Sequence, residues 1–326
     1  MTDNTEQSDE PSQSENPDLE VPDTEEALDE DDLELDEWWS WGNFARLFIF
    51  PLIIVAVAVL IWGTVQFLIR DTRTLNDHIS QIRNGAENQR WRAAYSLAQE
   101  VKRQQLEKKL TRSSALEIID LYRTAKDPRI RKYLALVLAE VPIDRTLNVL
   151  KKGLKSSDPG VKTNTILALG RLHENATNDA FKTRVRRLAP RIAEVLTHDS
   201  SKVRRIAAFV LGSLNNKSVI DDLRTTLNDE TPDVRWNGAI ALGQLGSDAG
   251  EDELISVLKD SLRKRFQKKK QMDPSLRRNL LTNVIQALGK LKSRRALPLL
   301  KKIKENDRDS KVRKSALEAI NNIQQS

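Results

Sequence analysis

Over the last two thirds of the chain, apolar residues recur in a fixed phrase. Each copy begins with a polar turn, continues with a branched residue and usually Arg or Lys, and ends in small and aliphatic residues close to Ala-Leu-Gly. In one copy, apolar side chains fall at the spacing of a single helix face. That face comprises Val203, Ile206, Ala207, Val210 and Leu211. The copies begin near Asp127, Asp158, Asp199, Thr231, Asp273 and Asp309.

Equivalent positions near the ends of these copies are 31, 42, 31, 46 and 32 residues apart. About 30 residues accommodate two short helices and two turns, so the longer steps contain insertions. Second helices are predicted at 219–227, 253–262 and 296–303. Because neither helix of a pair can bury its stripe alone, the pattern predicts an all-α solenoid of stacked pairs over residues 86–326, a fold that usually presents a binding surface.

The ends of the phrase have their own chemistry. Asp accepts hydrogen bonds from free backbone N–H groups, and Pro suits the first helical position, so each Asp-Pro is a predicted helix start. The terminal glycines are interpreted as helix caps or as places where two helices pack closely.

This phrase resembles the HEAT-like repeat family, especially the short repeats first described in phycobilisome lyases. The resemblance covers residues 86–326 and implies an armadillo-like helical solenoid. Its implications for function are broad, because the family contains scaffolds, adaptors and a few enzymes. Nothing in the repeated phrase is itself catalytic, so the activity of the bilin lyases is not carried over.

A second feature lies upstream of the repeats. Residues 47–69 contain no charged residue, which is long enough for a membrane-spanning helix. We predict a retained, single-pass transmembrane helix within 38–70, with interfacial tryptophans near its ends. A cleaved signal peptide would need a basic start, which is missing here. The chain would then be a membrane-anchored member of the family. The predicted span includes Leu47, Pro51, Ile53, Val57, Leu60 and Ile69.

The first 37 residues hold 17 Asp and Glu and no Lys or Arg. Such a segment cannot bury enough apolar surface to offset its ordering entropy, so we predict a disordered acidic tail. The net charge of +6 therefore combines two opposite regions, since 53 basic residues face only 30 acidic ones from Trp38 onward.

The charges beside the apolar segment predict its orientation. Only Arg46 lies close on the amino side, whereas several arginines crowd the carboxyl side, and this bias marks the cytoplasmic side. We expect an external acidic tail and a cytoplasmic solenoid, which a juxtamembrane linker helix over 71–85 joins to the span. An exported solenoid stays open, because a large trailing domain can be translocated regardless of its charge.

Candidates for chemistry are few. The chain has no Cys, which excludes thiolate catalysis and zinc–thiolate sites. Its three histidines, His78, His173 and His198, lie in different repeats. His173-Glu174 is the one His-Glu pair reminiscent of iron-binding HEAT-like hydroxylases, which need several such pairs. We therefore expect a non-enzymatic protein with no catalytic residue, cofactor or metal.

One basic residue holds the same place in most copies. These residues are Arg131, Lys162, Arg204, Arg235 and Arg313. They are interpreted as structural, each meeting an Asp of its own or a neighbouring turn. The alternative is a basic ladder for an acidic partner.

Other basic residues cluster on the predicted second helices and in the longest insertion, 263–270. The resemblance to HEAT-like solenoids implies that the second helices line the concave side. The clusters suggest a positive track for anionic lipid, nucleic acid or acidic protein segments, against the alternative of a solvated basic surface. The candidate binding residues are Lys151, Lys152, Lys155, Arg184, Arg187, Arg191, Arg263, Lys264, Arg265, Lys268, Lys269 and Lys270.

Two hypotheses for function follow. The chain is a membrane-anchored scaffold or adaptor that binds a protein partner, or it is a binder of anionic lipid or nucleic acid in which Arg263–Lys270 supplies most of the attraction. Binding driven by charge weakens steeply with salt, whereas a groove with apolar anchors changes much less.

Overall fold

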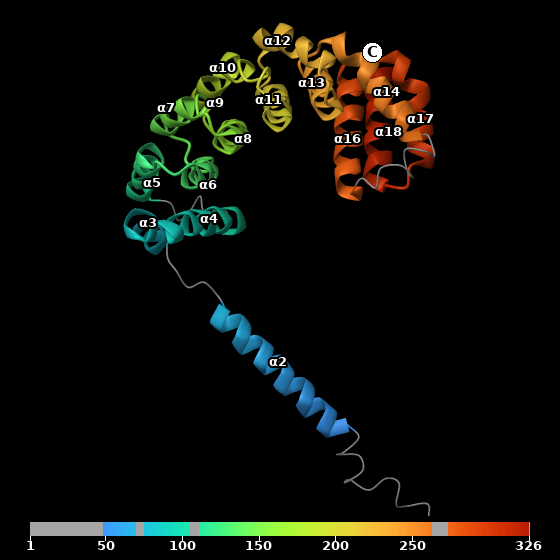
Figure 1. Cartoon of the computed structure of the whole chain (residues 1–326). Helices are drawn as coiled ribbons and strands as arrows, with labels where there is room; N and C mark the ends of the chain where they lie inside the picture. The colour runs from blue at the N-terminus through green and yellow to red at the C-terminus, as the bar shows by residue number, and fades with distance from the viewer. Residues whose placement is uncertain (1–47, 70–74, 105–110, 263–272, 326) are drawn as a thin grey trace, which may run out of the picture. The chain divides into compact units, whose positions relative to one another are not determined.

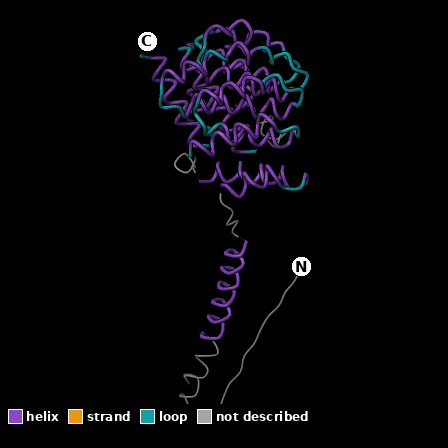
Figure 2. The backbone as a smooth tube through the Cα atoms, turned by 90° about the vertical axis from the view of Figure 1, so that its left-hand side faces the viewer, coloured by secondary structure: helices purple, strands orange, loops and turns teal. Residues whose placement is uncertain are grey.

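The computed structural model describes residues 48–69, 75–104, 111–262 and 273–325, and within these ranges every regular element is a helix. The chain divides into two compact units, Met1–Thr72 and Arg73–Ser326. Figures 1 and 2 show the second unit as successive helices joined by short loops. The predicted all-α solenoid is confirmed for this unit.

The described part of the first unit is essentially one helix, α2, which spans Phe50–Ile69. It carries no charged residue, and its side chains, described as far as Thr64, are exposed. Within the described residues no helix combines the length and the apolar character needed to cross a membrane, so the structure does not support the predicted span. The predicted acidic tail, 1–37, lies outside the described residues.

The second unit consists of helices in pairs. The first members are α3 (Leu75–Asn84), α5 (Arg112–Thr124), α7 (Asp144–Gly153), α9 (Asp179–Arg186) with α10 (Ala189–Ala193), α12 (Ile220–Thr225), α14 (Glu251–Leu262) and α17 (Leu297–Asn306). Their partners are α4 (Glu87–Gln104), α6 (Pro128–Leu138), α8 (Pro159–Asn175), α11 (Ser201–Leu214), α13 (Pro232–Gln244), α16 (Pro274–Lys290) and α18 (Ser310–Gln324). The predicted second helices correspond to α12, α14 and α17.

The pairs stack into two rows. The inner row consists of α4, α6, α8, α11, α13, α16 and α18, and each of these helices packs against the next. The outer row holds the remaining helices, which contact their row neighbours less closely. Figure 1 shows the second unit curving so that the inner row faces the hollow of the arc. The helices that carry the repeated phrase are therefore the ones that line the concave side.

Small residues explain why these helices form the inner row. A Cβ added at Gly212 would lie 2.9 Å from Cβ of Ala241, and one at Gly243 would lie 2.9 Å from Cβ of Ala287. These contacts are closer than side-chain carbon atoms tolerate, so only glycine permits the observed approach. The terminal glycines Gly212 and Gly243 therefore serve close packing, one of the two predicted roles, whereas the helix caps are Asn215 and Leu245. The closely packed row lies inside the curve.

The Asp-Pro turns begin helices as the sequence indicates. Oδ1 of Asp127 accepts from the backbone N of Arg129 at 2.7 Å, and Oδ1 of Asp158 accepts from the backbone N of Val161 at 2.7 Å. Asp273 and Asp309 cap α16 and α18 in the same way. Each Pro that follows Asp127, Asp158 or Asp273 lies in the first turn, where no backbone donor is needed.

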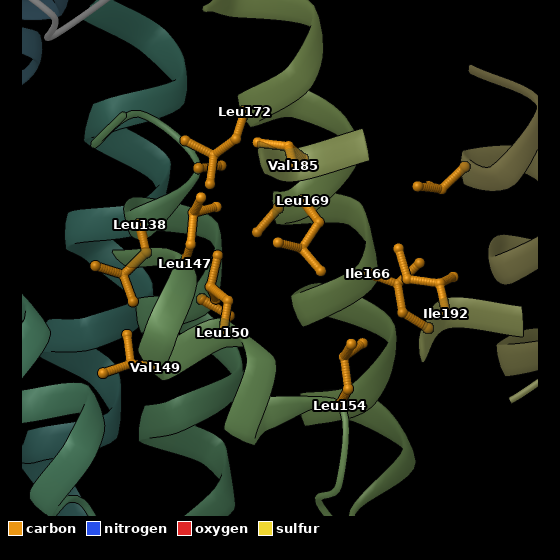
Figure 3. Close-up of a cluster of buried hydrophobic side chains, with 14 of the residues drawn as sticks. Leu138, Leu147, Val149, Leu150, Leu154, Ile166, Leu169, Leu172, Val185 and Ile192 are labelled. Atoms are coloured by element: carbon orange, nitrogen blue, oxygen red, sulfur yellow. The ribbon is translucent and has the colours of Figure 1, made fainter. Parts of the chain in front are cut away.

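The core lies between the two rows. Figure 3 shows how Leu138 of α6, Leu150 of α7 and Leu169 of α8 gather with Val185 of α9. Each of these side chains is fully buried. Every helix pair contributes to the space between its neighbours, and the buried apolar side chains form two successive clusters, one from Ile79 to Leu245 and one from Ala239 to Ile323.

The second unit begins before the first copy of the phrase. Helix α3 packs against α4 and buries His78, Ile79 and Ile82. The sequence prediction treats residues 71–85 as a linker helix outside the solenoid, whereas α3 is the outer partner of α4.

Candidate protein-binding surface

The exposed apolar side chains of the second unit gather on the inner row. Among its described residues, four large apolar side chains are exposed, and all four belong to inner-row helices. They are Tyr95 on α4 (43% exposed), Phe209 on α11 (44%), Leu276 on α16 (61%) and Leu317 on α18 (45%). Such a distribution is typical of an interaction surface, because a solvated face normally shows no such preference.

Two of these residues, Tyr95 and Phe209, hold equivalent positions in their helices. Phe209 is the ninth residue after Ser200, which precedes α11, and Tyr95 is the ninth after Ala86, which precedes α4. The same place on α6 and α8 is held by half-buried Leu136 and Leu167, and on α13 by buried Ile240. Equivalent positions on neighbouring parallel helices lie side by side, so these residues make an apolar stripe across α4, α6, α8, α11 and α13, which ends where Thr282 and Glu318 hold the same place on α16 and α18.

Aromatic rings reinforce one end of this stripe. The rings of Tyr95 and Tyr133 meet edge to face, with centroids 5.1 Å apart. Nζ of Lys132 lies 4.7 Å from the ring centroid of Tyr133, and the guanidinium of Arg129 lies 5.5 Å from that of Trp91. Cations over aromatic faces are held by the ring quadrupole. This end of the surface therefore offers apolar area and positive charge together.

The repeated basic residue is structural, as the sequence interpretation favours. Arg204 donates to both carboxylate oxygens of Asp229, and Arg235 donates through Nη1 to the backbone oxygens of Asp229 and Glu230. Arg313 likewise donates to the backbone oxygen of Asp307. These side chains join helices to turns.

Two members of the ladder depart from the prediction. Lys162 and Arg131 have no carboxylate partner among the described residues, and the guanidinium of Arg131 instead lies 5.5 Å from the ring centroid of Tyr122. The sequence reasoning also missed Arg277, which is buried and bonded to Asp307. The signal that could have identified it is its spacing: Arg277 follows Asp273 by four residues, as Arg131 follows Asp127.

The basic candidates lie on the outer row. Lys151 and Lys152 belong to α7, Lys155 follows it, and Arg184 and Arg191 belong to α9 and α10. The expectation that these helices line the concave side is wrong, because the small residues of the repeated phrase bring the other row inside. Arg187 lies between α9 and α10. The insertion with Arg263, Lys264, Arg265, Lys268, Lys269 and Lys270 lies outside the described residues.

The exposed outer cations differ in their partners. Nη2 of Arg184 lies 3.0 Å from Oδ1 of Asp144, and its guanidinium lies 5.8 Å from the ring centroid of Phe181. Lys151, Lys155 and Arg187 have no ion pair among the described residues. The structure thus separates two surfaces, an inner one with apolar anchors and an outer one with unpaired positive charge.

The described histidines serve the fold. His78 is buried with Nε2 3.4 Å from Oε2 of Glu100, and Nδ1 of His198 accepts from the backbone N of Ser200 at 3.0 Å. Burial and nearby cations lower the pKa of His173 at the end of α8. Within the described parts of the chain, no group of acidic or histidine side chains is arranged to hold a metal ion.

Comparison with known proteins agrees with this architecture. Residues 188–268 match the family of HEAT repeats. An engineered protein of known structure is 18% identical, with a TM-score of 0.50 over 77% of this chain and 68% of that chain. The complex of CpcE and CpcF of phycocyanin lyase from Nostoc sp. PCC7120 is 16% identical, with a TM-score of 0.49 over 78% of this chain and 96% of that chain.

A designed armadillo repeat protein in complex with the peptide (KR)4 is 14% identical, with a TM-score of 0.46 over 77% of this chain and 100% of that chain. No curated protein matches the chain in sequence. The helix pairs establish an α-solenoid, and residues 188–268 within it match HEAT repeats.

Proposed function

We propose that this chain is a non-enzymatic scaffold or adaptor that binds a protein partner along its inner row. The observation that carries this proposal is the restriction of exposed large apolar side chains in the described second unit to inner-row helices. Water is expelled when such side chains enter a partner's surface, and large aromatic anchors dominate the energy of such interfaces. Tyr95 and Phe209 are the anchors expected to contribute most.

A protein partner suits this surface better than an anionic polymer. The anchors are apolar, and one cation beside them is already paired, since Nη2 of Arg129 lies 2.8 Å from Oδ2 of Asp127. A polymer of phosphates would instead favour the outer row, where Lys151 and Arg187 carry unpaired charge. Binding to the inner row should therefore persist at moderate salt, while binding of nucleic acid or anionic lipid should not.

Site-specific photo-crosslinking tests this function. The full-length chain carries a benzoylphenylalanine in place of Phe209, or, as a control, in place of the exposed outer-row Thr225. We expect one discrete protein adduct from position 209 that disappears when Tyr95→Ser is added. Equal adducts from both positions, or an adduct that Tyr95→Ser leaves unchanged, would contradict binding along the inner row.

The proposal includes attachment to a membrane through residues 47–69, with the solenoid in the cytoplasm and the acidic tail outside. Its support is the sequence: an uncharged stretch that includes α2, flanked by arginines on its carboxyl side. A tag after Ser326 should resist protease until cells are permeabilised, and the chain should stay with membranes at alkaline pH. Release into the alkaline supernatant would remove the membrane from the proposal.

A further inference from the structure

The outer row contains a groove that the inner surface does not involve. One cavity of about 750 Å³ lies between α5, α7 and α9, and a second of about 500 Å³ continues it between α5 and α7. Leu116 and Arg145 line both. The groove exists because outer-row helices diverge where the array curves, while the inner row remains closely packed.

Each wall of the narrower part is one face of a helix. Helix α5 presents Leu116, Ile119, Asp120 and Arg123, and helix α7 presents Arg145, Asn148, Val149 and Lys152. Both sets have the i, i+3, i+4, i+7 spacing of a single face. Leu116, Ile119 and Val149 supply the apolar part of this lining, and Arg145 and Lys152 stand along its α7 edge.

The charges of the groove do not cancel. Each acidic lining residue already has a cation, since Asp120 pairs with Arg123 at 2.7 Å, Asp144 with Arg184 at 3.0 Å, and Glu140 with Arg171 at 2.7 Å. The remaining lining cations, Arg112, Arg145 and Lys152, are exposed and form no ion pair within the described residues. The groove therefore presents surplus positive charge beside apolar side chains.

From this arrangement we infer that the groove docks an extended acidic segment of a partner protein. Arg145 and Lys152 are seven residues apart on α7, or about 10 Å along the axis. A peptide in the extended polyproline II conformation has three residues per turn and advances about 3.1 Å per residue, so carboxylates three residues apart lie on one face, about 9 Å apart, and reach both cations. An apolar residue between them packs on Leu116 and Val149. This site is separate from the inner surface, so either can fail without the other.

Fluorescence anisotropy with the full-length chain tests the site. The probe is a labelled peptide that repeats Glu-Leu-Ser, and its matched control repeats Gln-Leu-Ser. We expect the acidic peptide alone to bind, and R145E/K152E to weaken its binding by about tenfold. The control variant, K151E/K155E, makes the same charge change at exposed neighbouring residues that do not line the groove, and it should retain most of the affinity.

Four outcomes would overturn this assignment. Equal losses in the two double variants would reduce the binding to general attraction between opposite charges. No binding of the acidic peptide would remove the site. Tighter binding of single-stranded DNA or phosphatidylserine vesicles, with the same dependence on Arg145 and Lys152, would replace the protein segment with a phosphate-bearing ligand. Tighter binding of a peptide of residues 1–37 would make the chain's own tail the occupant. Circular dichroism of both variants establishes that they are folded.

Discussion

Arg204 on α11 and Asp229, just before α13, form a two-point ion pair between neighbouring repeats. Nε of Arg204 donates to Oδ2 of Asp229 at 2.7 Å, and Nη2 donates to Oδ1 at 2.9 Å. Both side chains are only 10% exposed. Asp229 also accepts from the backbone N of Thr231 at 2.9 Å, so one carboxylate joins α11 to the turn that opens α13.

An equivalent ion pair joins α16 to the turn before α18. Arg277 on α16 pairs with Asp307, and Asp307 accepts from the backbone N of Asp309 at 2.9 Å. Asp229 lies two residues before Thr231, which precedes α13, and Asp307 lies two residues before Asp309, which precedes α18. The equivalent residue before α8 is Ser156, and before α11 it is His198. Each still accepts a hydrogen bond from the backbone N two residues later, but neither forms the ion pair.

Removing one partner of this pair should destabilise the solenoid. Asp229→Ala leaves the Arg204 guanidinium buried without its carboxylate, and such a loss costs about 3 kcal/mol of unfolding free energy. Urea denaturation of the second unit measures it. The control is Asp221→Ala, which breaks an exposed pair with Arg224 and should cost at most about 0.5 kcal/mol. Similar losses in the two variants would show that the buried link has no special weight.

The same pair predicts a response to acid. Hydrogen bonds from Arg204 hold the pKa of Asp229 below its ordinary value. The folded state therefore binds the proton less readily than the unfolded state, so the pair stabilises the fold above about pH 4, the unfolded value. This stability declines as the pH falls from there through the lowered pKa. Asp229→Asn should flatten that part of the curve of melting temperature against pH, and an unchanged curve would refute the assignment.

His198 offers a gain of stability. His198 holds the position in its repeat that Asp229 holds in the next, and Lys162 is the equivalent of Arg204. Burial and the charge of Lys162 lower the pKa of His198. Wild-type stability should fall as the pH drops below about 6.5, the unfolded value, because the unfolded state takes up the proton first. His198→Asp should remove this loss and add about 0.5 kcal/mol at neutral pH by pairing with Lys162. If adding Lys162→Gln to His198→Asp leaves the gain intact, the pair is not its source.

Close packing of the inner row is tested at glycine. Gly243→Val places side-chain atoms against Ala287, where even a Cβ would be 2.9 Å away, and should cost about 1–3 kcal/mol. Gly160→Ala is the control, because its Cβ meets the flexible Lys132 side chain and carboxylate of Asp158, and it should be within about 0.5 kcal/mol of wild type. Thermal denaturation compares the two, and equal costs would argue against a packing origin.

Phe209 should contribute little to stability for its size. It is exposed on α11, whereas the nearby Leu211 is fully buried. Phe209→Ser should change the free energy of unfolding by about 0.5 kcal/mol or less, while Leu211→Ala should cost about 2–5 kcal/mol. A large loss for Phe209→Ser would mean that its ring serves the fold rather than a partner.

The fold was largely predictable because its signals are local. The stripe of Val203, Val210 and Leu211 and the Asp and Pro of each turn specify helices and their starts through neighbouring residues alone. Only part of the candidate site was predictable. The basic residues on α7 were found, but Tyr95 and Phe209 were not identified as surface anchors. Phe209 lies outside the predicted stripe, and spacing alone does not show whether such a ring packs against a neighbouring repeat or is exposed.

Spacing and composition alone specify the repeats, the helix pairs and the uneven charge of the chain. The tertiary structure decided which helices line the concave side, because that depends on how closely Gly212 and Gly243 let neighbouring helices approach. It also decided the partner of Arg277 and the groove beside Arg145. These features join residues from different repeats, and only the packing of the helices brings such residues together.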